Sequence, residues 1–247
     1  MGYYIRKRGD NMLAQRIVRK EYLEKLTVFK DKQLIKVITG IRRCGKSTLM
    51  EIYQDFLRDN GVSEQQIIVV NFEDYDFYEL RDSHKLYSYL KERLAPGKMS
   101  YIFLDEIQRC EKFSEVIDSL YIKKNVDIYI TGSNAYLLSS EIATLLSGRY
   151  VEIKMLPLSF REYVESTGTS EGLARKYREY LENSSFPYTL ELTGQKKEIR
   201  DYLDAIYNTV IVKDIGQRHK IIDTLMFESI TRFVFDNIGN QLSTKKI

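Results

Sequence analysis

The sequence has no tryptophan, and only two cysteines, three prolines and two histidines among its 247 residues. Two cysteines cannot build a disulfide framework, and with two histidines they leave too few ligands for a dedicated zinc site. So few prolines, with 13 glycines, exclude a collagen-like or proline-rich chain. The longest apolar runs, such as 67–70 and 101–104, are too short to cross a bilayer.

The charge balance is nearly even, with 38 basic and 35 acidic side chains and a net charge of +3. A nucleic-acid partner is permitted but has no positive support, because such domains usually carry clustered basic residues. The charged first residues have no apolar stretch behind them, which argues against a secretory signal. We therefore expect a cytoplasmic protein with no membrane partner.

Apolar segments alternate with amphipathic helical segments over residues 16–155. The expected strands are continuously apolar, which is typical of a parallel sheet covered by helices on both faces. These strands are 34–39, 67–72, 99–104, 126–131 and 150–155. The expected helices have apolar residues at helical spacing and are 16–30, 47–59, 82–94 and 111–123. This order predicts an α/β fold.

No continuously apolar segment typical of a strand follows Pro157. Four more helices are expected, at 159–165, 171–183, 195–214 and 224–237. The sequence therefore predicts a loose arm at 1–15, a core at 16–157 and an all-helical part after it. Ser243 is typical of a helix N-cap, but no helical segment follows it in the sequence. We therefore expect that the chain ends inside an element of a longer protein.

Residues 40–47 read Gly-Ile-Arg-Arg-Cys-Gly-Lys-Ser and match G-x-x-x-x-G-K-[ST] between an expected strand and an expected helix. In such a P-loop the main-chain N–H groups surround phosphates, and the helix N-terminus adds its positive dipole end. Lys46 would contact the β- and γ-phosphates, and the Ser47 hydroxyl would ligate Mg²⁺. The predicted nucleotide-binding set is Gly40, Ile41, Arg42, Arg43, Cys44, Gly45, Lys46, Ser47 and Thr48.

Three side chains inside this loop have two interpretations each. Arg42 and Arg43 could contact phosphate or a neighbouring acid, or they could face solvent. Cys44 is either a small group that fits the loop or a thiol made reactive by the helix N-terminus, which lowers thiol pKa values.

Residues 99–106 form an apolar strand that ends in two acids, which is a Walker B pattern. Asp105 would hold Mg²⁺, and Glu106 would polarise the attacking water. Glu73 or Asp74, after the second expected strand, is either an alternative base or a support for the site.

Residues 127–134 form another apolar strand, which ends in Ser133 and Asn134. Either side chain could act as a γ-phosphate sensor, or it could cap the helix expected to follow. Arg149 comes after that helix. It could reach a phosphate across a subunit interface as an arginine finger, or it could face the dipole of a helix C-terminus.

The P-loop with its double arginine resembles that of a large prokaryotic family of AAA-type ATPases, described mostly as ATP-binding proteins. Further matches to this family are 71–74, 103–108, 130–134, 146–149 and 156–160. The resemblance implies an additional-strand P-loop NTPase core that binds ATP and Mg²⁺. It also implies a helical lid at 158–222, a winged-helix-like segment from 223 to 247, and a further C-terminal domain in cis that would follow.

Together these features predict an ATPase that couples Mg-ATP hydrolysis to a change between core and lid. The alternatives are a nucleotide-dependent switch or scaffold with little turnover, and a DNA-processing motor. A GTPase is disfavoured because no Asn-Lys-x-Asp-type segment follows a strand. The predicted catalytic set is Lys46, Glu106, Ser133, Asn134 and Arg149, the last acting in trans within a homo-oligomer, and the predicted metal ligands are Ser47 and Asp105.

Overall fold

The computed structural model describes residues 16–133, 146, 148–192, 194–210, 223–241 and 243. The chain divides into two compact units between Gly194 and Gln195. The first unit contains the sheet and the helices that cover it, and the second contains the last two helices. None of the helices within the described ranges is long and apolar enough to cross a membrane.

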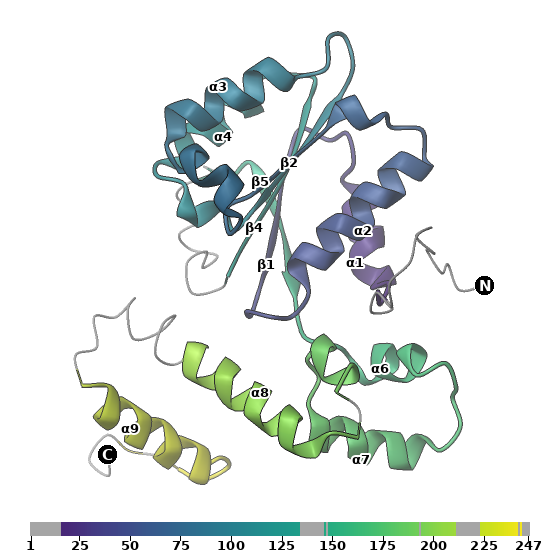
Figure 1. Ribbon diagram of the computed structural model, residues 1–247, viewed down its shortest axis with the longest axis vertical. Coiled ribbons are helices and arrows are strands. Elements are labelled where there is room, and N and C mark those ends of the chain that lie inside the picture. Colours follow the sequence, from purple (N-terminus) through teal and green to yellow (C-terminus); the bar gives the residue numbers. More distant parts are fainter. Residues whose placement is uncertain are drawn as a thin grey trace. The chain divides into compact units, whose positions relative to one another are not determined.

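Five strands form one sheet in the order β2-β3-β4-β1-β5, and every neighbouring pair is parallel (Figure 1). The strands are β1 (Ile35–Gly40), β2 (Ile67–Asn71), β3 (Ser100–Asp105), β4 (Val126–Ser133) and β5 (Tyr150–Met155). β4 lies between β1 and β3, so it is the additional strand of the predicted core. The predicted α/β fold with a P-loop NTPase sheet is confirmed.

The helices of the first unit are α1 (Lys20–Val28), α2 (Lys46–Asp59), α3 (Ser83–Arg93), α4 (Phe113–Tyr121), α6 (Phe160–Ser166) and α7 (Leu173–Asn183). Its short 3-10 helices are η1 (Glu64–Gln66), η2 (Tyr75–Arg81), η3 (Ile107–Arg109) and η4 (Pro187–Leu190). The second unit contains α8 (Lys196–Asn208) and α9 (Thr224–Asp236).

Most bounds differ from the expected ones by a few residues, and two differences have a local cause or were not expected at all. The first helix begins at Lys20 rather than at residue 16, because Arg19 leaves the helical region with φ −86° and ψ 79°. The turn η2, at 75–81, was not expected. The predicted arm and residues 211–214 of the expected third lid helix lie outside the described residues. α6 and α7, from the predicted lid, belong to the same unit as the sheet, and the winged-helix assignment of 223–247 stays a prediction.

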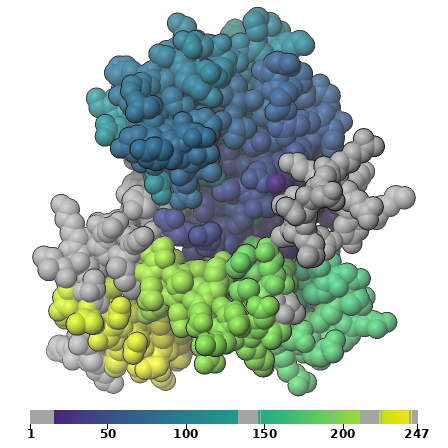
Figure 2. Space-filling model, viewed as in Figure 1, coloured from purple at the N-terminus to yellow at the C-terminus, as the bar shows by residue number. Residues whose placement is uncertain are grey.

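Both faces of the sheet are buried, which explains why each strand is continuously apolar. Successive side chains on a strand point to opposite faces. Val37 packs in one cluster with residues of α3 and α4, and its neighbour Ile38 packs in another with residues of α1 and α2. Figure 1 shows these helix pairs on opposite sides of the strands. On the face seen in Figure 2, the blue and teal part of the chain presents a continuous packed surface.

A buried ion pair joins the amino-terminal halves of β1 and β4. The Lys36 ammonium donates to Asp127, and both side chains are almost completely buried. The carboxylate of Asp127 also accepts hydrogen bonds from the main-chain N–H of Asp31 and from the Tyr129 hydroxyl, each at 2.9 Å. These additional donors satisfy the buried carboxylate, as a charge in the core requires.

Candidate functional site

The predicted P-loop lies at the carboxyl end of β1 and leads directly into α2. Gly40 ends the strand, and a Cβ atom there would lie 2.4 Å from the Met155 carbonyl oxygen, so only glycine fits. Gly45 has a left-handed backbone with φ +99° and forms the N-cap of α2. Arg43 is exposed and also has a positive φ, of 68°, which is uncommon for a residue with a side chain.

Lys46 lies back across this loop. Its side chain is buried, and the Nζ atom donates to the carbonyl oxygens of Gly40 at 3.1 Å and Ile41 at 3.4 Å. Because these partners are neutral, the positive charge of the buried ammonium is left to interact with an anion. The loop geometry and this charge together make an anion-binding site at the start of α2.

The remaining loop side chains differ in accessibility. Ser47 is exposed and Thr48 is half-buried at the first turn of α2. Cys44 is fully buried, and burial raises the pKa of its thiol, whereas a reactive thiol needs a lowered pKa. The reactive-thiol interpretation of Cys44 is therefore wrong, and the residue is a small buried group of the loop.

The first predicted acid, Asp105, ends β3 and the second, Glu106, follows it; both are buried, with Asp105 7% and Glu106 8% exposed. The Thr131 hydroxyl, on β4, donates to the Asp105 carboxylate and accepts from the Glu106 main-chain N–H at 3.0 Å. Glu106 has a left-handed backbone, and the Gln108 side-chain amide donates to its carboxylate. Thr131 and Gln108 were absent from the predicted site, although both occur in segments that match the family.

The loop and the acids lie at the same edge of the sheet. In the strand register, Gly40 is opposite Ser133 on β4, and Leu104, next to Asp105, is opposite Ile130. Only β4 separates β1 from β3, which puts the two strand ends about 10 Å apart. A triphosphate with a bound cation can span a gap of this size.

Glu73 follows β2 and pairs with two arginines. The Arg109 guanidinium donates to Glu73 Oε1 at 3.1 Å, and Arg42 Nη1 lies 3.7 Å from the same oxygen. Glu73 therefore connects the P-loop with the turn that follows the acid pair. This geometry favours the supporting role over that of an alternative base.

The other three predicted residues, Ser133, Asn134 and Arg149, differ in how far the structure places them. Ser133 ends β4 beside Gly40, but its side chain is not among the described ones, and Asn134 lies outside the described residues. Arg149 precedes β5, pairs with Asp118 at 3.1 Å and has a carbonyl that accepts from Ile35 N–H. It therefore lies at the amino-terminal edge of the sheet, opposite the P-loop of its own chain.

Arg19 is a junction residue that the sequence did not single out. It forms a two-pronged ion pair with Glu162 of α6, with N–O distances of 2.7 and 2.8 Å. Its guanidinium also donates to the carbonyl oxygens of Leu156 at 2.6 Å, Pro157 at 3.2 Å and Cys44 at 3.4 Å. One buried side chain thus holds the P-loop, the end of β5 and the start of α6 together.

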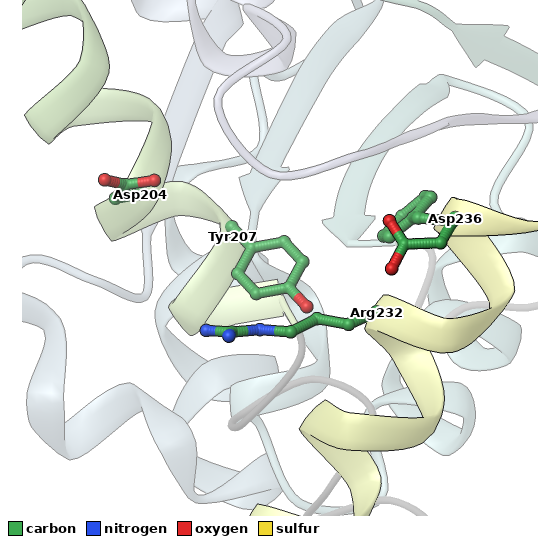
Figure 3. Close-up of a pocket in the computed structure, with 5 residues that line it drawn as sticks. Asp204, Tyr207, Arg232 and Asp236 are labelled. Atoms are coloured by element: carbon green, nitrogen blue, oxygen red, sulfur yellow. The ribbon is translucent and has the colours of Figure 1, made fainter.

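The second unit contains a hollow of about 310 Å³ between α8 and α9, lined by Asp204, Tyr207, Arg232, Phe235 and Asp236. Figure 3 shows Tyr207 projecting from α8 toward the side of α9 that carries Arg232. No residue of the predicted nucleotide site lines this hollow.

A family model described as an AAA domain matches residues 32–164, which include the P-loop, the acid pair and all five strands. The chain belongs to this AAA domain family. It is 37% identical over 235 residues to an uncharacterized protein of Haemophilus influenzae, covering 94% of this chain and 58% of that protein. It is 31% identical over 227 residues to an uncharacterized protein of Methanocaldococcus jannaschii, covering 86% and 49%.

Among solved structures, this AAA domain chain is similar to the Walker-type ATPase PABY2304 of Pyrococcus abyssi, with a TM-score of 0.51. The two share 18% sequence identity over 83% of this chain and 76% of that one, which is a similarity of fold. The chain spans about half the length of the curated relatives that it matches. The predicted AAA-type ATPase family is therefore confirmed.

Proposed function

We propose that this chain binds ATP with Mg²⁺ and hydrolyses it to ADP and phosphate. The observation that carries the proposal is the buried ammonium of Lys46 in a P-loop only two strands away from the buried acids Asp105 and Glu106. Membership of the AAA domain family supports the nucleotide-binding half of the proposal.

The oxygen donors at this edge suit Mg²⁺. The described residues contain no group of three or more His, Cys, Asp or Glu side chains that could hold a metal ion. Mg²⁺ usually keeps several waters and is bound through one or two carboxylates and substrate phosphates. Ser47 and Asp105 would hold it here, and its charge would offset that of the phosphates.

The chain's own residues have separable roles in this proposal. Lys46 stabilises the negative charge that develops on the transferred phosphoryl group. Glu106 orients the attacking water and accepts one of its protons, for which a buried carboxylate is suited whose main chain is held by Thr131 and whose side chain is held by Gln108. Thr131 holds both acids at the strand end.

Arg19 supports the coupling of hydrolysis to movement of the helical lid. It contacts the Cys44 carbonyl inside the P-loop and the Glu162 carboxylate on α6. A shift of the loop that follows nucleotide binding would therefore change the contacts of α6. The same proposal has three further parts. Arg149 acts in trans within a homo-oligomer, the protein is cytoplasmic, and a further domain lies in cis.

The test compares two variants with matched controls. Lys46→Ala should weaken ATP binding about 100-fold in titration calorimetry, because a buried charge contact is lost. Glu106→Gln should keep ATP affinity while slowing phosphate release by about 100-fold or more. Lys98→Ala and Glu111→Gln remove exposed side chains of the same types and should leave both quantities unchanged. Unaltered ATP affinity in Lys46→Ala would contradict the assignment.

The alternatives give different outcomes in a phosphate-release assay with ATP or GTP. Tight ATP binding without phosphate release would favour a switch or scaffold. Stimulation by DNA would favour a motor. A rate per subunit that rises with protein concentration and is lost in Arg149→Ala would support the arginine finger in trans.

A further inference from the structure

Gln108 has two polar atoms with different surroundings. It lies two residues after Glu106, in the turn η3, and its amide nitrogen donates to Glu106 Oε2. Its carbonyl oxygen is buried and has no hydrogen-bond partner among the described residues. The orientation of the amide follows from chemistry, because only the NH₂ group can donate to a carboxylate.

The neighbouring Glu106 is held at both its main chain and its side chain. Its backbone has φ 55° and ψ 48°, and its main-chain N–H donates to Thr131 Oγ1 at 3.0 Å. The Gln108 amide then holds the carboxylate itself. The carboxylate and the carbonyl oxygen of Gln108 therefore form two adjacent acceptors at the end of β3.

Buried acceptors in native proteins are nearly always hydrogen-bonded to protein or to water. We propose that Gln108 is a positioning residue for the hydrolytic water, whose two protons point to the Glu106 carboxylate and to Gln108 Oε1. This inference rests on the proposed hydrolysis and adds a residue to it. When both O–H groups of the water donate to these two acceptors, a lone pair of its oxygen is left to point toward the γ-phosphorus.

The reaction step balances with these two residues. The water oxygen forms a bond to the γ-phosphorus, and the bond from that phosphorus to the bridging oxygen breaks with its electron pair going to ADP. One proton of the water passes to the Glu106 carboxylate. The other proton stays on the new phosphate oxygen and is the one hydrogen-bonded to Gln108.

A purely restraining role for Gln108 makes the opposite prediction. A restraint that holds Glu106 away from the reaction needs only the amide nitrogen, and it leaves the buried carbonyl oxygen without a partner. Removing such a restraint would accelerate hydrolysis. Removing a positioning residue slows it, because small misplacements of a reactant reduce rates strongly.

The experiment measures kcat, KM and ATP affinity for Gln108→Ala and for Gln108→Met, which keeps the size without the polar atoms. We expect kcat to fall about 10- to 100-fold in both, with ATP affinity within about twofold of wild type. Gln65→Ala, which removes an exposed glutamine from the turn η1, is the matched control and should keep wild-type kcat.

The unchanged ATP affinity shows that each variant is folded around its P-loop. A kcat equal to or above that of wild type in both variants would overturn the role of Gln108 while leaving ATP hydrolysis in place. A wild-type protein that binds ATP without any turnover would remove the proposed hydrolysis, and the positioning of a water with it. Slower turnover in both variants with retained affinity supports the inference.

Discussion

The junction around Arg19 gives a strong prediction for stability. Replacing Arg19 by alanine removes a two-pronged ion pair to Glu162 and three donations to main-chain carbonyls. The side chains of the pair are only 5% and 15% exposed, so little water reaches them. Without the Arg19 guanidinium, the largely buried carboxylate of Glu162 loses its positively charged partner.

The size of the effect follows from this burial. Breaking a buried ion pair by removing one partner costs about 3–5 kcal/mol, whereas exposed pairs contribute about 0.2–1 kcal/mol. Since Glu162 keeps some exposure, we expect Arg19→Ala to lower the free energy of unfolding by about 3 kcal/mol. Arg16, whose side chain is 41% exposed and pairs with Glu51 and Asp55, provides the matched control.

The assay is urea unfolding followed by circular dichroism and by tyrosine fluorescence, since the chain has no tryptophan. Arg16→Ala should lower the free energy of unfolding by less than about 1 kcal/mol. The double variant Arg19→Ala with Glu162→Gln should lose less than the sum of the single losses, because the two residues act through one contact. Equal losses for Arg19→Ala and Arg16→Ala would refute the reasoning.

The same junction adds a pH dependence. Burial raises the pKa of Glu162, but hydrogen bonds from Arg19 and Ser159 lower it by more, so the pKa lies below its ordinary value of 4.5. The stabilisation is therefore complete above about pH 5 and is lost as the pH falls through the lowered pKa. Glu162→Gln should remove this part of the acid sensitivity, which a comparison of unfolding midpoints from pH 6 to pH 3 measures.

Three further perturbations test other parts of the fold. Gly40→Ala should abolish ATP binding in calorimetry, because its Cβ would lie 2.4 Å from a main-chain carbonyl oxygen, whereas Gly61→Ala, which strains a left-handed backbone of φ +87° but meets no neighbouring atom, should lower stability and keep wild-type affinity. Lys36→Met should cost about 3–5 kcal/mol in urea unfolding, and adding Asp127→Asn should recover much of it, which an additive loss would disprove. Cys44 is buried with a raised pKa, so Ellman's reagent at pH 8 should react with it only after denaturation; rapid labelling of the native protein would contradict this.

Local sequence patterns predict most of the core, because the spacing of apolar residues that indicates each strand or helix lies within a few consecutive residues. The strands are continuously apolar since both faces of the sheet are covered, and their observed bounds lie close to the expected ones. The P-loop and the acid pair follow from short motifs for the same reason. The insertion of β4 between β1 and β3 depends on long-range pairing, and only the family resemblance indicated it.

Contacts between distant parts of the chain could not be predicted in this way. Arg19 and Glu162 are 143 positions apart, and nothing near either residue indicates its partner. The first helix starts late because Arg19 turns away from helical geometry at the point where its side chain contacts α6. The role of Thr131 likewise depends on β4 lying beside β3, which places its hydroxyl against Asp105.

The position of Arg149 restricts the symmetry of any assembly that uses it. The P-loop lies at the carboxyl-terminal edge of the sheet, and Arg149 lies at the amino-terminal edge, where its carbonyl accepts from Ile35. Two copies related by a two-fold axis would have to present both edges to each other at once. Donation of Arg149 to a neighbour's phosphate therefore requires one of two arrangements: an antiparallel two-fold contact, in which both copies donate, or a head-to-tail association, which closes into a ring or continues as a filament.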